Sequence, residues 1–543
     1  MLPQPSIFAE ESQPARPGRL TRGNFYQKST CNIDDTGYYI TMNTKRLESI
    51  IKIHPRDNVA VALETLEIGT RVNVDGSTID VREQVAIGHK IATTAISSRT
   101  PVYKYGWCIG LASKNIEPGE HVHVHNLETQ LNGETSFTYS PIEATDVKHV
   151  STHIPSATFS GYHRGGTLTG IRNEIWILPT VGCVARTCQK IAAEAQKRYG
   201  HLVDGVYAFS HPFGCSQLGD DLANTRQILA SLASHPNAGA VLVVGLGCEN
   251  NKIDTLMSLI KKPSNRLAYF NAQNVNDELE SGLQQIEGLA KLCANDERSR
   301  RPLSELKIGL KCGGSDAFSG LTANPLVGAI ATELAHEGGS PILTEIPEIF
   351  GAEMSLLSRA KDKPTFDNAS EMINRFKRYF INHNLPISKN PSPGNIDGGI
   401  TTLEEKSLGA VQKSGDALLT TVLEYGEQAT GQGLALLNAP GNDAISSTAL
   451  AASGAHIILF TTGRGTPLGF PVPTIKISSN AHLAKSKPNW IDFDSSVRLD
   501  GIPMTEVVGN LWNLILATCE GKRTKSEIND EREIAIWKSG VSL

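Results

Sequence analysis

The chain has 543 residues, 40% of them hydrophobic and 20% charged, with a formal net charge of −5. This length predicts two or three domains, on a prior of roughly 150 residues each. The weak negative charge excludes broad nucleic-acid binding, which needs a basic surface. The sequence has no run of about 20 uninterrupted apolar residues, so it predicts no membrane-spanning helix and no membrane partner.

The N-terminal residues 1–46 carry Pro, Ser and Gln without a sustained period, and they predict a disordered extension. Met42 is a second candidate for the start of translation. The opening residues lack the charged-then-apolar order of a secretory signal. Together with nine cysteines, an odd number, this predicts a cytoplasmic protein with free thiols, some of them available as metal ligands.

Residues 47–128 predict a small β-rich domain. Short runs typical of strands, such as NVAVAL, PVYKYG and HVHVHN, alternate with turns. Three stretches repeat one local form, LEIG (66–69), VAIG (85–88) and IEPG (116–119), each with a glycine placed to turn the chain. Residues 129–158 are polar and predict a linker.

From residue 159 onward, strand-like runs alternate with amphipathic stretches, which is typical of α/β domains with parallel sheets. We expect one α/β domain over residues 159–390 and a C-terminal α/β domain over 391–543. Polar loops follow the strand-like runs, for example GLGCENN after VLVV. Because ligands bind outside the carboxyl ends of parallel strands, these loops are expected to form one or two shared clefts.

Four of these loops carry a cysteine soon after the strand-like run, and three further residues in comparable positions have metal-binding side chains. Thiolate and imidazole suit iron or zinc, and carboxylates complete the shell of iron or manganese. A buried cysteine acting as a small hydrophobe is the competing interpretation for each thiol alone. The set favours a metal or cluster site. The candidate ligands are Cys183, Cys215, Cys248, Cys312, His211, Glu249 and Glu345.

Other motifs are weaker. GLGCEN and TGRGTP lack the third glycine of a dinucleotide fingerprint, and no GxxxxGK[ST] occurs. VHVHN (122–126) places His123 and His125 on one face of a predicted strand. Such a pair can ligate a metal or transfer protons, although a structural pair has the same pattern.

Several long motifs resemble one family of enzymes. They include GHKIA, KYGWCIG, GEHVHVHN, RNEIWILPTVGC, GCSQLGDD, CGGSDAFSGLTANP, NPSPGN and TTGRGTP, spread from about residue 50 to the C-terminus. These stretches resemble the sugar-acid dehydratases, the family of altronate and galactarate dehydratases, which is similar to sulfolactate sulfo-lyase. The resemblance implies a SAF-type (β-clip) small domain. It also implies a hydro-lyase of sugar-acid catabolism that removes water from D-altronate to give 2-dehydro-3-deoxy-D-gluconate.

The implied reaction explains which residue types are needed. The resemblance implies a divalent metal, usually Fe2+, with Mn2+ or an iron–sulfur cluster as alternatives. The α-proton of a carboxylate is weakly acidic, so positive charge must stabilise the aci-carboxylate while a base takes the proton. The candidate catalytic residues are His89, Lys90, Lys104, His123 and His125, and the candidate substrate-binding residues are Arg464, Lys406, Asn442 and Asp443. For each basic residue, a solvated surface charge is the alternative.

Substrate choice rests on a narrower signal. HVHVHN matches the altronate type within the family, whereas the galactarate type lacks these histidines. Galactarate or another aldarate is the alternative substrate, and a metal-dependent relative without catalysis is the alternative from another class. A small sugar acid is the expected partner, with a homodimer as a further expectation.

Overall fold

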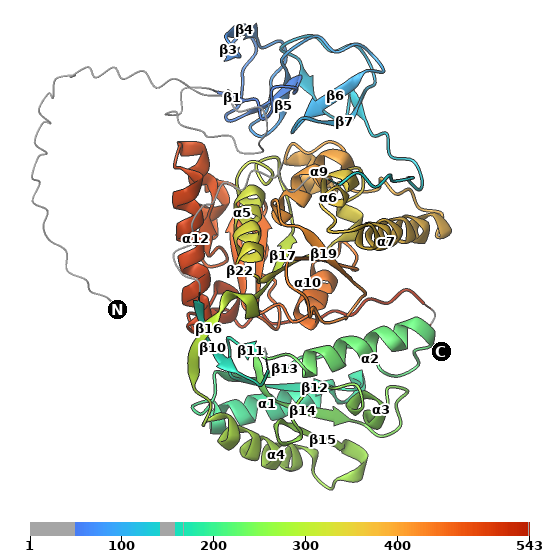
Figure 1. Ribbon diagram of the computed structural model, residues 1–543, viewed down its shortest axis with the longest axis vertical. Helices are drawn as coiled ribbons and strands as arrows, with labels where there is room; N and C mark the ends of the chain where they lie inside the picture. Colours follow the sequence, from blue (N-terminus) through green and yellow to red (C-terminus); the bar gives the residue numbers. More distant parts are fainter. Residues whose placement is uncertain (1–48, 142–157, 167, 541, 543) are drawn as a thin grey trace, which may run out of the picture. The chain divides into compact units, whose positions relative to one another are not determined.

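A computed structural model describes residues 49–141, 158–166, 168–540 and 542 (Figure 1). The predicted extension over residues 1–46, with Met42, and most of the predicted linker therefore lie outside the described residues. No helix within the described ranges is long and apolar enough to cross a membrane.

The small domain is built from short antiparallel strands, which confirms the predicted β-rich fold. Three sheets have the orders β1-β2-β5-β8, β3-β4 and β6-β7-β9. The strands are β1 (Ile50–Ile51), β2 (Val59–Ala62), β3 (Arg71–Val74), β4 (Ser77–Asp80), β5 (Lys90–Ala92), β6 (Pro101–Lys104), β7 (Trp107–Ala112), β8 (His121–Val122) and β9 (Leu127–Glu128).

The three repeated glycine turns are present. Gly69, Gly88 and Gly119 have φ of +82°, +82° and +89°, a left-handed conformation that side chains with a Cβ resist. At Gly119 a Cβ would also lie 2.0 Å from the carbonyl oxygen of Asp80. Each repeat therefore needs its glycine to lead the chain from one strand to the next.

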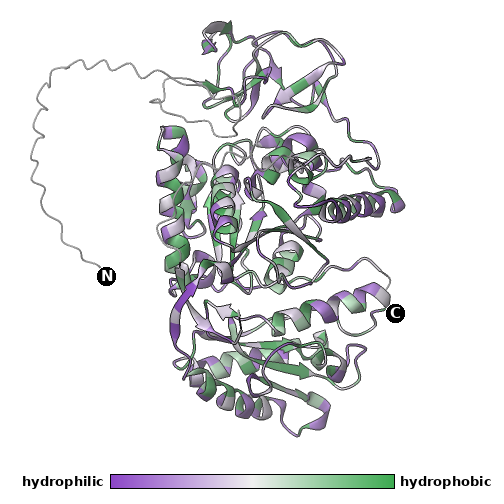
Figure 2. Ribbon diagram, in the orientation of Figure 1, coloured by the Kyte–Doolittle hydropathy of each residue, from purple (hydrophilic) through white to green (hydrophobic). Residues whose placement is uncertain are grey.

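A four-stranded parallel sheet, with the order β13-β12-β14-β15, forms the first α/β domain. Every residue of β12 (Glu174–Pro179) and β14 (Ala238–Gly245) is buried, because helices cover both faces. Figure 2 shows the hydrophobic character of these strands. The other elements are β13 (Gly205–Ala208), β15 (Leu267–Asn271), α1 (Ala185–Tyr199), α2 (Gly219–Ala233), α3 (Ile253–Met257) and α4 (Glu278–Cys293).

A seven-stranded sheet has the order β19-β20-β18-β17-β21-β22-β23 and is parallel throughout. Its strands are β17 (Lys307–Cys312), β18 (Ser340–Leu343), β19 (Leu419–Leu423), β20 (Leu434–Leu437), β21 (Ile457–Thr462), β22 (Thr474–Ser478) and β23 (Phe493–Asp494). The predicted boundary at residue 390 therefore cuts through one sheet. The change of sheet instead falls between β15 and β17, where β16 (Arg298–Pro302) joins β10 (Thr158–His163) and β11 (Thr169–Gly170) in a third sheet.

Helices and short turns complete the C-terminal region. α5 (Ala323–His336) packs against α12 (Met504–Cys519), and α10 (Asp443–Ala452) packs against both β17 and α2. The remaining helices are α6 (Glu353–Leu357), α7 (Lys363–Asn382), α8 (Pro393–Asp397), α9 (Leu403–Val411), α11 (Ala481–Ser486) and α13 (Lys525–Ile528). The two parallel sheets share one hydrophobic core, in which Trp176 of β12 and Phe460 of β21 are both buried.

Candidate active site

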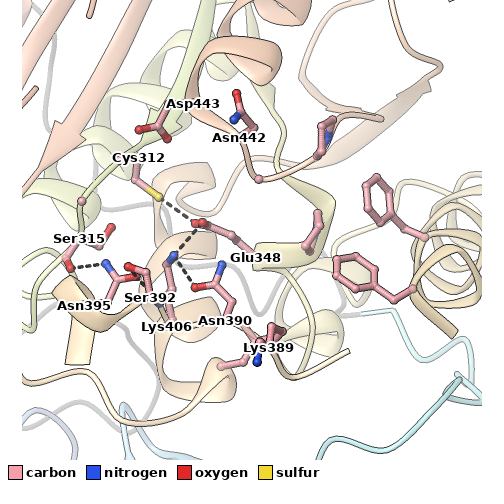
Figure 3. Close-up of a pocket in the computed structure, with 18 of the residues that line it drawn as sticks. Cys312, Ser315, Glu348, Lys389, Asn390, Ser392, Asn395, Lys406, Asn442 and Asp443 are labelled. Atoms are coloured by element: carbon pink, nitrogen blue, oxygen red, sulfur yellow. Dashed lines mark hydrogen bonds and ion pairs between the residues drawn. The ribbon is translucent and has the colours of Figure 1, made fainter. Parts of the chain in front are cut away.

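A cavity of about 680 Å³ lies at the carboxyl ends of β17, β18 and β20 (Figure 3). Its polar side chains come from the loops after these strands and from α8 and α9, and its aromatic side chains come from α7 and the C-terminal segment. The main polar lining residues are Cys312, Ser315, Glu348, Lys389, Asn390, Ser392, Asn395, Lys406, Asn442 and Asp443. This position is the one expected for a ligand site in a parallel sheet.

Six charged side chains surround the inner end of the cavity and neutralise one another. Lys311 lies 2.8 Å from Asp443, Lys413 3.2 Å from Glu345, and Lys406 2.8 Å from Glu348. Lys311 also pairs with Glu345. We call Lys311, Glu345, Glu348, Lys406, Lys413 and Asp443 the charged cluster. Because all six are paired, the cluster holds its charges in place without a bound ion.

The thiol of Cys312 belongs to this cluster. Its Sγ lies 2.8 Å from Lys413 Nζ and donates to Glu348 at 3.3 Å. Burial and the charge of Glu345 raise the pKa of Cys312 to about 12, so the thiol stays neutral. Cys312, Glu345 and Glu348 have donor atoms within 4.8 Å of one another, but the lysines already supply the positive charge that a cation would bring. The arrangement therefore does not favour the predicted metal at Cys312 and Glu345.

The two glutamates of the cluster have opposite pKa shifts. Burial and neighbouring Glu348 raise the pKa of Glu345. Burial opposes ionisation of Glu348 too, but Lys406 and Lys311 hold its pKa at about 2. Glu345 also has a φ of +70°, and such backbone strain gathers at functional sites. These features set the cluster apart from an ordinary surface ion pair.

The outer wall offers groups for a polyhydroxy acid. Lys389 is exposed at the cavity, and no side chain in the described ranges pairs with it. Asn390 Oδ1 accepts from Lys406 at 3.0 Å, which leaves its NH2 group for a ligand. Asn395 donates to the carbonyl of Ser315 at 2.7 Å. The motif NPSPGN contains both amides and follows Lys389 directly, but no local pattern marks these three residues as ligand-binding.

Three of the four predicted substrate-binding residues line the cavity. Lys406 and Asp443 reach it from α9 and α10, and Asn442 accepts from the amides of Ala444 and Ile445 as the N-cap of α10. Arg464 is exposed and does not line it. Its backbone amide donates to Gly314, a lining residue, at 3.0 Å, so Arg464 lies beside the cavity rather than in its wall.

Three histidines of the small domain form a second group. Donor nitrogens of His89, His121 and His123 all lie within 4.8 Å of one another. The predicted strand through His123 and His125 is wrong, because β8 ends at Val122. Asn126 makes a turn there: its side chain accepts from His123 N at 2.9 Å and donates to the carbonyl of His121 at 2.9 Å. The turn brings in His121, which sequence reasoning missed, and leaves His125 exposed.

The three imidazoles are neutral at physiological pH. Burial, and then the neighbouring histidines and Lys90, lower the pKa of His121 to about 3 and that of His123 to about 4. Burial also lowers the pKa of His89. Neutral imidazoles keep a nitrogen lone pair for a metal. The donor set therefore fits a divalent transition metal.

The predicted catalytic lysines are buried and paired. Lys90 Nζ donates to the carbonyl of Gly399, to Thr401 and to Glu405, at 2.9, 2.7 and 2.9 Å. Lys104 lies 2.7 Å from Glu405. Burial lowers the pKa of Lys90 to about 8, whereas for Lys104 the charge of Glu405 outweighs burial and raises it. Neither lysine lines the cavity, so both attach the small domain to α9 rather than facing a ligand.

The segment from α8 to α9 links the histidine group to the cavity. His89 contacts the carbonyl of Asp397 at 3.3 Å, at the end of α8, while Asn395 in the same helix lines the cavity. On α9, Glu405 holds the small-domain lysines and the next residue, Lys406, faces the cavity. Both groups thus depend on this one segment.

The remaining predicted metal ligands lie in the other α/β domain. Cys183, Cys215 and Cys248 are exposed free thiols after β12, β13 and β14, whereas Cys312 is buried at the end of β17 in the seven-stranded sheet. The four cysteines therefore do not form the single set that was predicted.

Two predicted ligands near these thiols, His211 and Glu249, make hydrogen bonds to neighbouring protein groups. His211 Nε2 donates to the carbonyl of Pro179 at 2.8 Å, and its Nδ1 accepts from Phe213 N at 3.2 Å. Glu249 accepts from Thr180, from Leu246 N at 3.1 Å and from Gly247 N at 2.6 Å. Although burial opposes it, these hydrogen bonds lower the pKa of Glu249. Both side chains therefore hold loops, and neither offers a free ligand atom in this arrangement.

Comparison with known proteins assigns the family. Three family models match in chain order: the SAF domain of altronate/galactarate dehydratases at residues 48–130, the second domain of D-galactarate dehydratase/altronate hydrolase at 161–294, and the C-terminal domain of D-galactarate/altronate dehydratases at 303–542. The altronate dehydratase of Escherichia coli K12 is 47% identical over 91% of this chain and 99% of its own length. The chain belongs to the altronate/galactarate dehydratase family.

Two further relatives place the chain within the family. The altronate dehydratase of Bacillus subtilis 168 is 46% identical over 92% of this chain and all of its own length. The galactarate dehydratase (L-threo-forming) of E. coli K12 is 31% identical over 87% of this chain and 93% of its own. Family membership confirms the predicted SAF domain and the predicted hydro-lyase class, and the cavity is the site where that chemistry is to be sought.

Proposed function

We propose that the protein removes water from D-altronate to give 2-dehydro-3-deoxy-D-gluconate, and that this reaction takes place in the cavity beside the charged cluster. The observation that carries the proposal is the cavity wall, which combines the unpaired ammonium of Lys389 with amides, hydroxyls and a carboxylate. Such a lining suits a six-carbon acid with several hydroxyl groups. The relatives of highest identity reported above, named altronate dehydratases, support the choice of substrate.

The positively charged side chains in the cavity wall are placed to bind the carboxylate of the substrate. Lys389 is free to pair with it, and Lys406 stands behind on α9 with its charge already held by Glu348 at 2.8 Å. Both ammonium groups stabilise the negative charge that builds on the carboxylate when the α-proton leaves. The NH2 group of Asn390 and the hydroxyl of Ser392 are placed to bind substrate hydroxyls, whereas the buried amide of Asn395 is bonded to Ser315 and Ser392.

We assign the α-proton to Asp443. Its Oδ1 is fixed by Lys311 at 2.8 Å, its side chain is 35% exposed, and no side chain in the described part of the chain takes Oδ2. Glu348, the other carboxylate in the wall, is a poor base because its pKa is held at about 2. A positioned base of this kind contributes about 100- to 10,000-fold in rate.

A divalent metal, Fe2+ with Mn2+ as the alternative, is proposed at His89, His121 and His123. Three neutral imidazole nitrogens within 4.8 Å of one another support this assignment. When bound, such a metal would supply Lewis acidity, and it would do so beside the cavity, because none of the three histidines is among the residues that line it. The chain's own contribution is to keep the imidazoles neutral by burial and to fix His123 against Thr401 at 3.2 Å. The predicted cytoplasmic location and homodimer stay predictions.

Turnover of purified protein tests the proposal. We expect formation of an α-keto acid from D-altronate, with kcat/KM for D-altronate well above that for galactarate. The Asp443→Asn variant should abolish most of this turnover, whereas Arg464→Gln, beside the cavity, should leave it within a few-fold. A preference for galactarate, the substrate named for the relative at 31% identity, would transfer the proposal to that aldarate. No turnover of either acid by folded, metal-loaded protein would refute it.

A further inference from the structure

Three thiols gather at one edge of the four-stranded sheet and have no role in the site described above. Cys183 follows β12, Cys215 follows β13 and Cys248 follows β14. All three are exposed and free. We call Cys183, Cys215 and Cys248 the thiol edge. Exposed free thiols are open to metal binding and to chemical reaction, in contrast to buried ones.

The loops that carry these thiols are fastened to one another by hydrogen bonds. Gly182 N donates to the carbonyl of Phe213 at 2.8 Å, which joins the first loop to the second. Asn251 N donates to the carbonyl of Gly214 at 3.0 Å, which joins the third loop to the second. Each bond lies within three residues of a cysteine. The three loops that carry the thiols are therefore joined to one another.

Further contacts strengthen this arrangement. The side chain of Asn250 accepts from Ser216 N at 2.8 Å, and the side chain of Asn251 donates to the carbonyl of Thr180 at 3.0 Å. Ser216, next to Cys215, has a φ of +57°. A residue other than glycine held in this region stores strain that the surrounding contacts must maintain. The sequence ENN, at the end of the VLVVGLGCENN run, supplies these fastening groups.

The arrangement of donors at the thiol edge does not favour a single tetrahedral ion. A tetrahedral metal needs donors about 4 Å apart, and no three metal-binding groups at this edge lie within 4.8 Å of one another among the residues that the structure describes. Cluster ligands lie farther apart because several irons separate them. His211 and Glu249, the nearby alternatives, have their ligand atoms in hydrogen bonds to the protein.

The local field at the thiol edge suits negative charge. α1 begins just after Cys183 and α2 begins four residues after Cys215, and neither 15-residue helix has a side-chain cap at its N-terminus. The free amides and the positive end of each helix dipole lower the cost of a thiolate. The positive ends of these helices would stabilise the negative charge of the thiolates and of a cluster bound to them.

We propose that the thiol edge holds an iron–sulfur cluster of the four-iron type through Cys183, Cys215 and Cys248. Three thiolates bind three of the four irons, so one iron has no ligand from these loops. The site rests on the thiols alone and does not depend on the proposed substrate. It adds a second kind of iron to that proposed at the three histidines.

The C-terminal segment contacts the helix and the loop that follow Cys215. Asp221, in the first turn of α2, accepts from the amides of Ser539 and Gly540, each at 2.8 Å. These residues follow Trp537, which lines the cavity, and two residues of extended chain span about 7 Å at most. Gln217, two residues after Cys215, pairs with Ser542. The C-terminal segment thus runs from the cavity wall to the thiol edge.

Metal and sulfide analysis of the full chain tests the site without an activity assay. After anaerobic reconstitution with iron and sulfide, we expect about four iron and about four sulfide per chain at this site. Each of Cys183→Ser, Cys215→Ser and Cys248→Ser should lower bound sulfide by more than half and weaken the visible charge-transfer absorbance. Cys108→Ser, at a partly exposed thiol of the small domain, is the matched control and should keep both.

The outcomes separate this site from the histidine site. A double variant, His89→Ala with His121→Ala, should lose iron without losing sulfide. Sulfide retained by the triple serine variant, or iron or zinc bound at the thiol edge without sulfide, would overturn the cluster. Because the three thiols are exposed, the serine variants are expected to fold, and circular dichroism confirms that loss of sulfide is not loss of structure.

Discussion

The two parallel sheets of this protein end in edges of opposite character. At the seven-stranded sheet, the charged cluster consists of ammonium and carboxylate groups that are paired with one another, as between Lys413 and Glu345, and all of them except Asp443 are buried. At the four-stranded sheet, the thiol edge consists of exposed side chains, and within the described residues none of them has a charged partner. Both edges follow the same topological rule, since each collects loops from the carboxyl ends of parallel strands.

The difference teaches that pairing, rather than position, decides what such an edge binds. A set of charges that neutralises itself offers oriented dipoles and a shaped wall, which suit an organic acid with hydroxyl groups. A set of unpaired thiols offers ligands to soft metals. Cys312 illustrates the point, because among the lysines of the charged cluster its pKa rises to about 12 and it stays a neutral thiol.

The largest expected effect tests the charged edge as the site of chemistry. Asp443→Asn keeps the shape of the side chain and removes the proposed proton acceptor, so kcat should fall by about 100- to 10,000-fold while KM changes little. Steady-state kinetics with D-altronate measures both. A variant that keeps more than about a tenth of kcat would remove Asp443 from proton transfer.

The next prediction concerns stability. Lys413→Met leaves Glu345 buried with one ammonium fewer, and breaking a buried pair costs about 3–5 kcal/mol in the free energy of unfolding. Lys363→Met is the matched control, because Lys363 and Asp367 form a pair whose side chains are 62% and 53% exposed. That exposed pair should contribute about 0–1 kcal/mol. Equal losses in denaturant titrations of the two variants would mean that the charged cluster is no more than a surface network.

The third prediction concerns the pH dependence of the free energy of unfolding, and it tests the contact between the two parallel sheets. Asn237, before β14, donates to the carbonyl of His456 at 3.2 Å, and burial together with Lys307 lowers the pKa of His456 to about 3. Between pH 6.5 and 3 the unfolded chain binds a proton that the folded protein excludes, so stability falls as pH falls through this window. The loss attributable to His456 should be about 1 kcal/mol per pH unit.

His456→Gln is the matched variant for that prediction. It removes the titrating group, so its unfolding free energy should depend less steeply on pH below 6.5 than that of the unchanged protein. Parallel curves for the two proteins would show that other groups cause the acid sensitivity.

The smallest expected effect concerns the specificity of the small domain. Replacing His123 and His125 together should lower both kcat/KM values, because His123 is a proposed metal ligand, and should change their ratio for D-altronate and galactarate only several-fold, because neither residue lines the cavity. An unchanged ratio, with both rates scaled equally, would show that these histidines have no part in substrate choice.

Sequence patterns predicted the fold class well and the sites only in part. Buried runs such as VLVV predict parallel strands and their polar loops, and the structure confirms both. Whether a loop residue is free cannot be read from such a pattern. Lys90 was predicted to be catalytic, yet Glu405, which is 315 positions away in sequence, holds it in a buried pair. Lys389 was missed because no local pattern distinguishes a free lysine from a paired one.

The histidine turn shows a second reason for such misses. Alternation in HVHVHN predicts a strand that continues to His125, but Asn126 folds the chain back by bonding to His121 and His123. A single asparagine side chain thus overrides the period-two pattern, since Asn readily bonds to backbone groups nearby. Only the three-dimensional arrangement reveals that His121 joins His89.

A crystal structure of the Asp443→Asn variant with D-altronate tests the central claim most directly, namely that the sugar acid is dehydrated beside the charged cluster. We expect the sugar acid inside the cavity, its carboxylate within hydrogen-bond distance of Lys389 or Lys406 and its C2 facing the substituted side chain. D-altronate bound elsewhere, or bound in the cavity with C2 turned away from that side chain, would contradict the account.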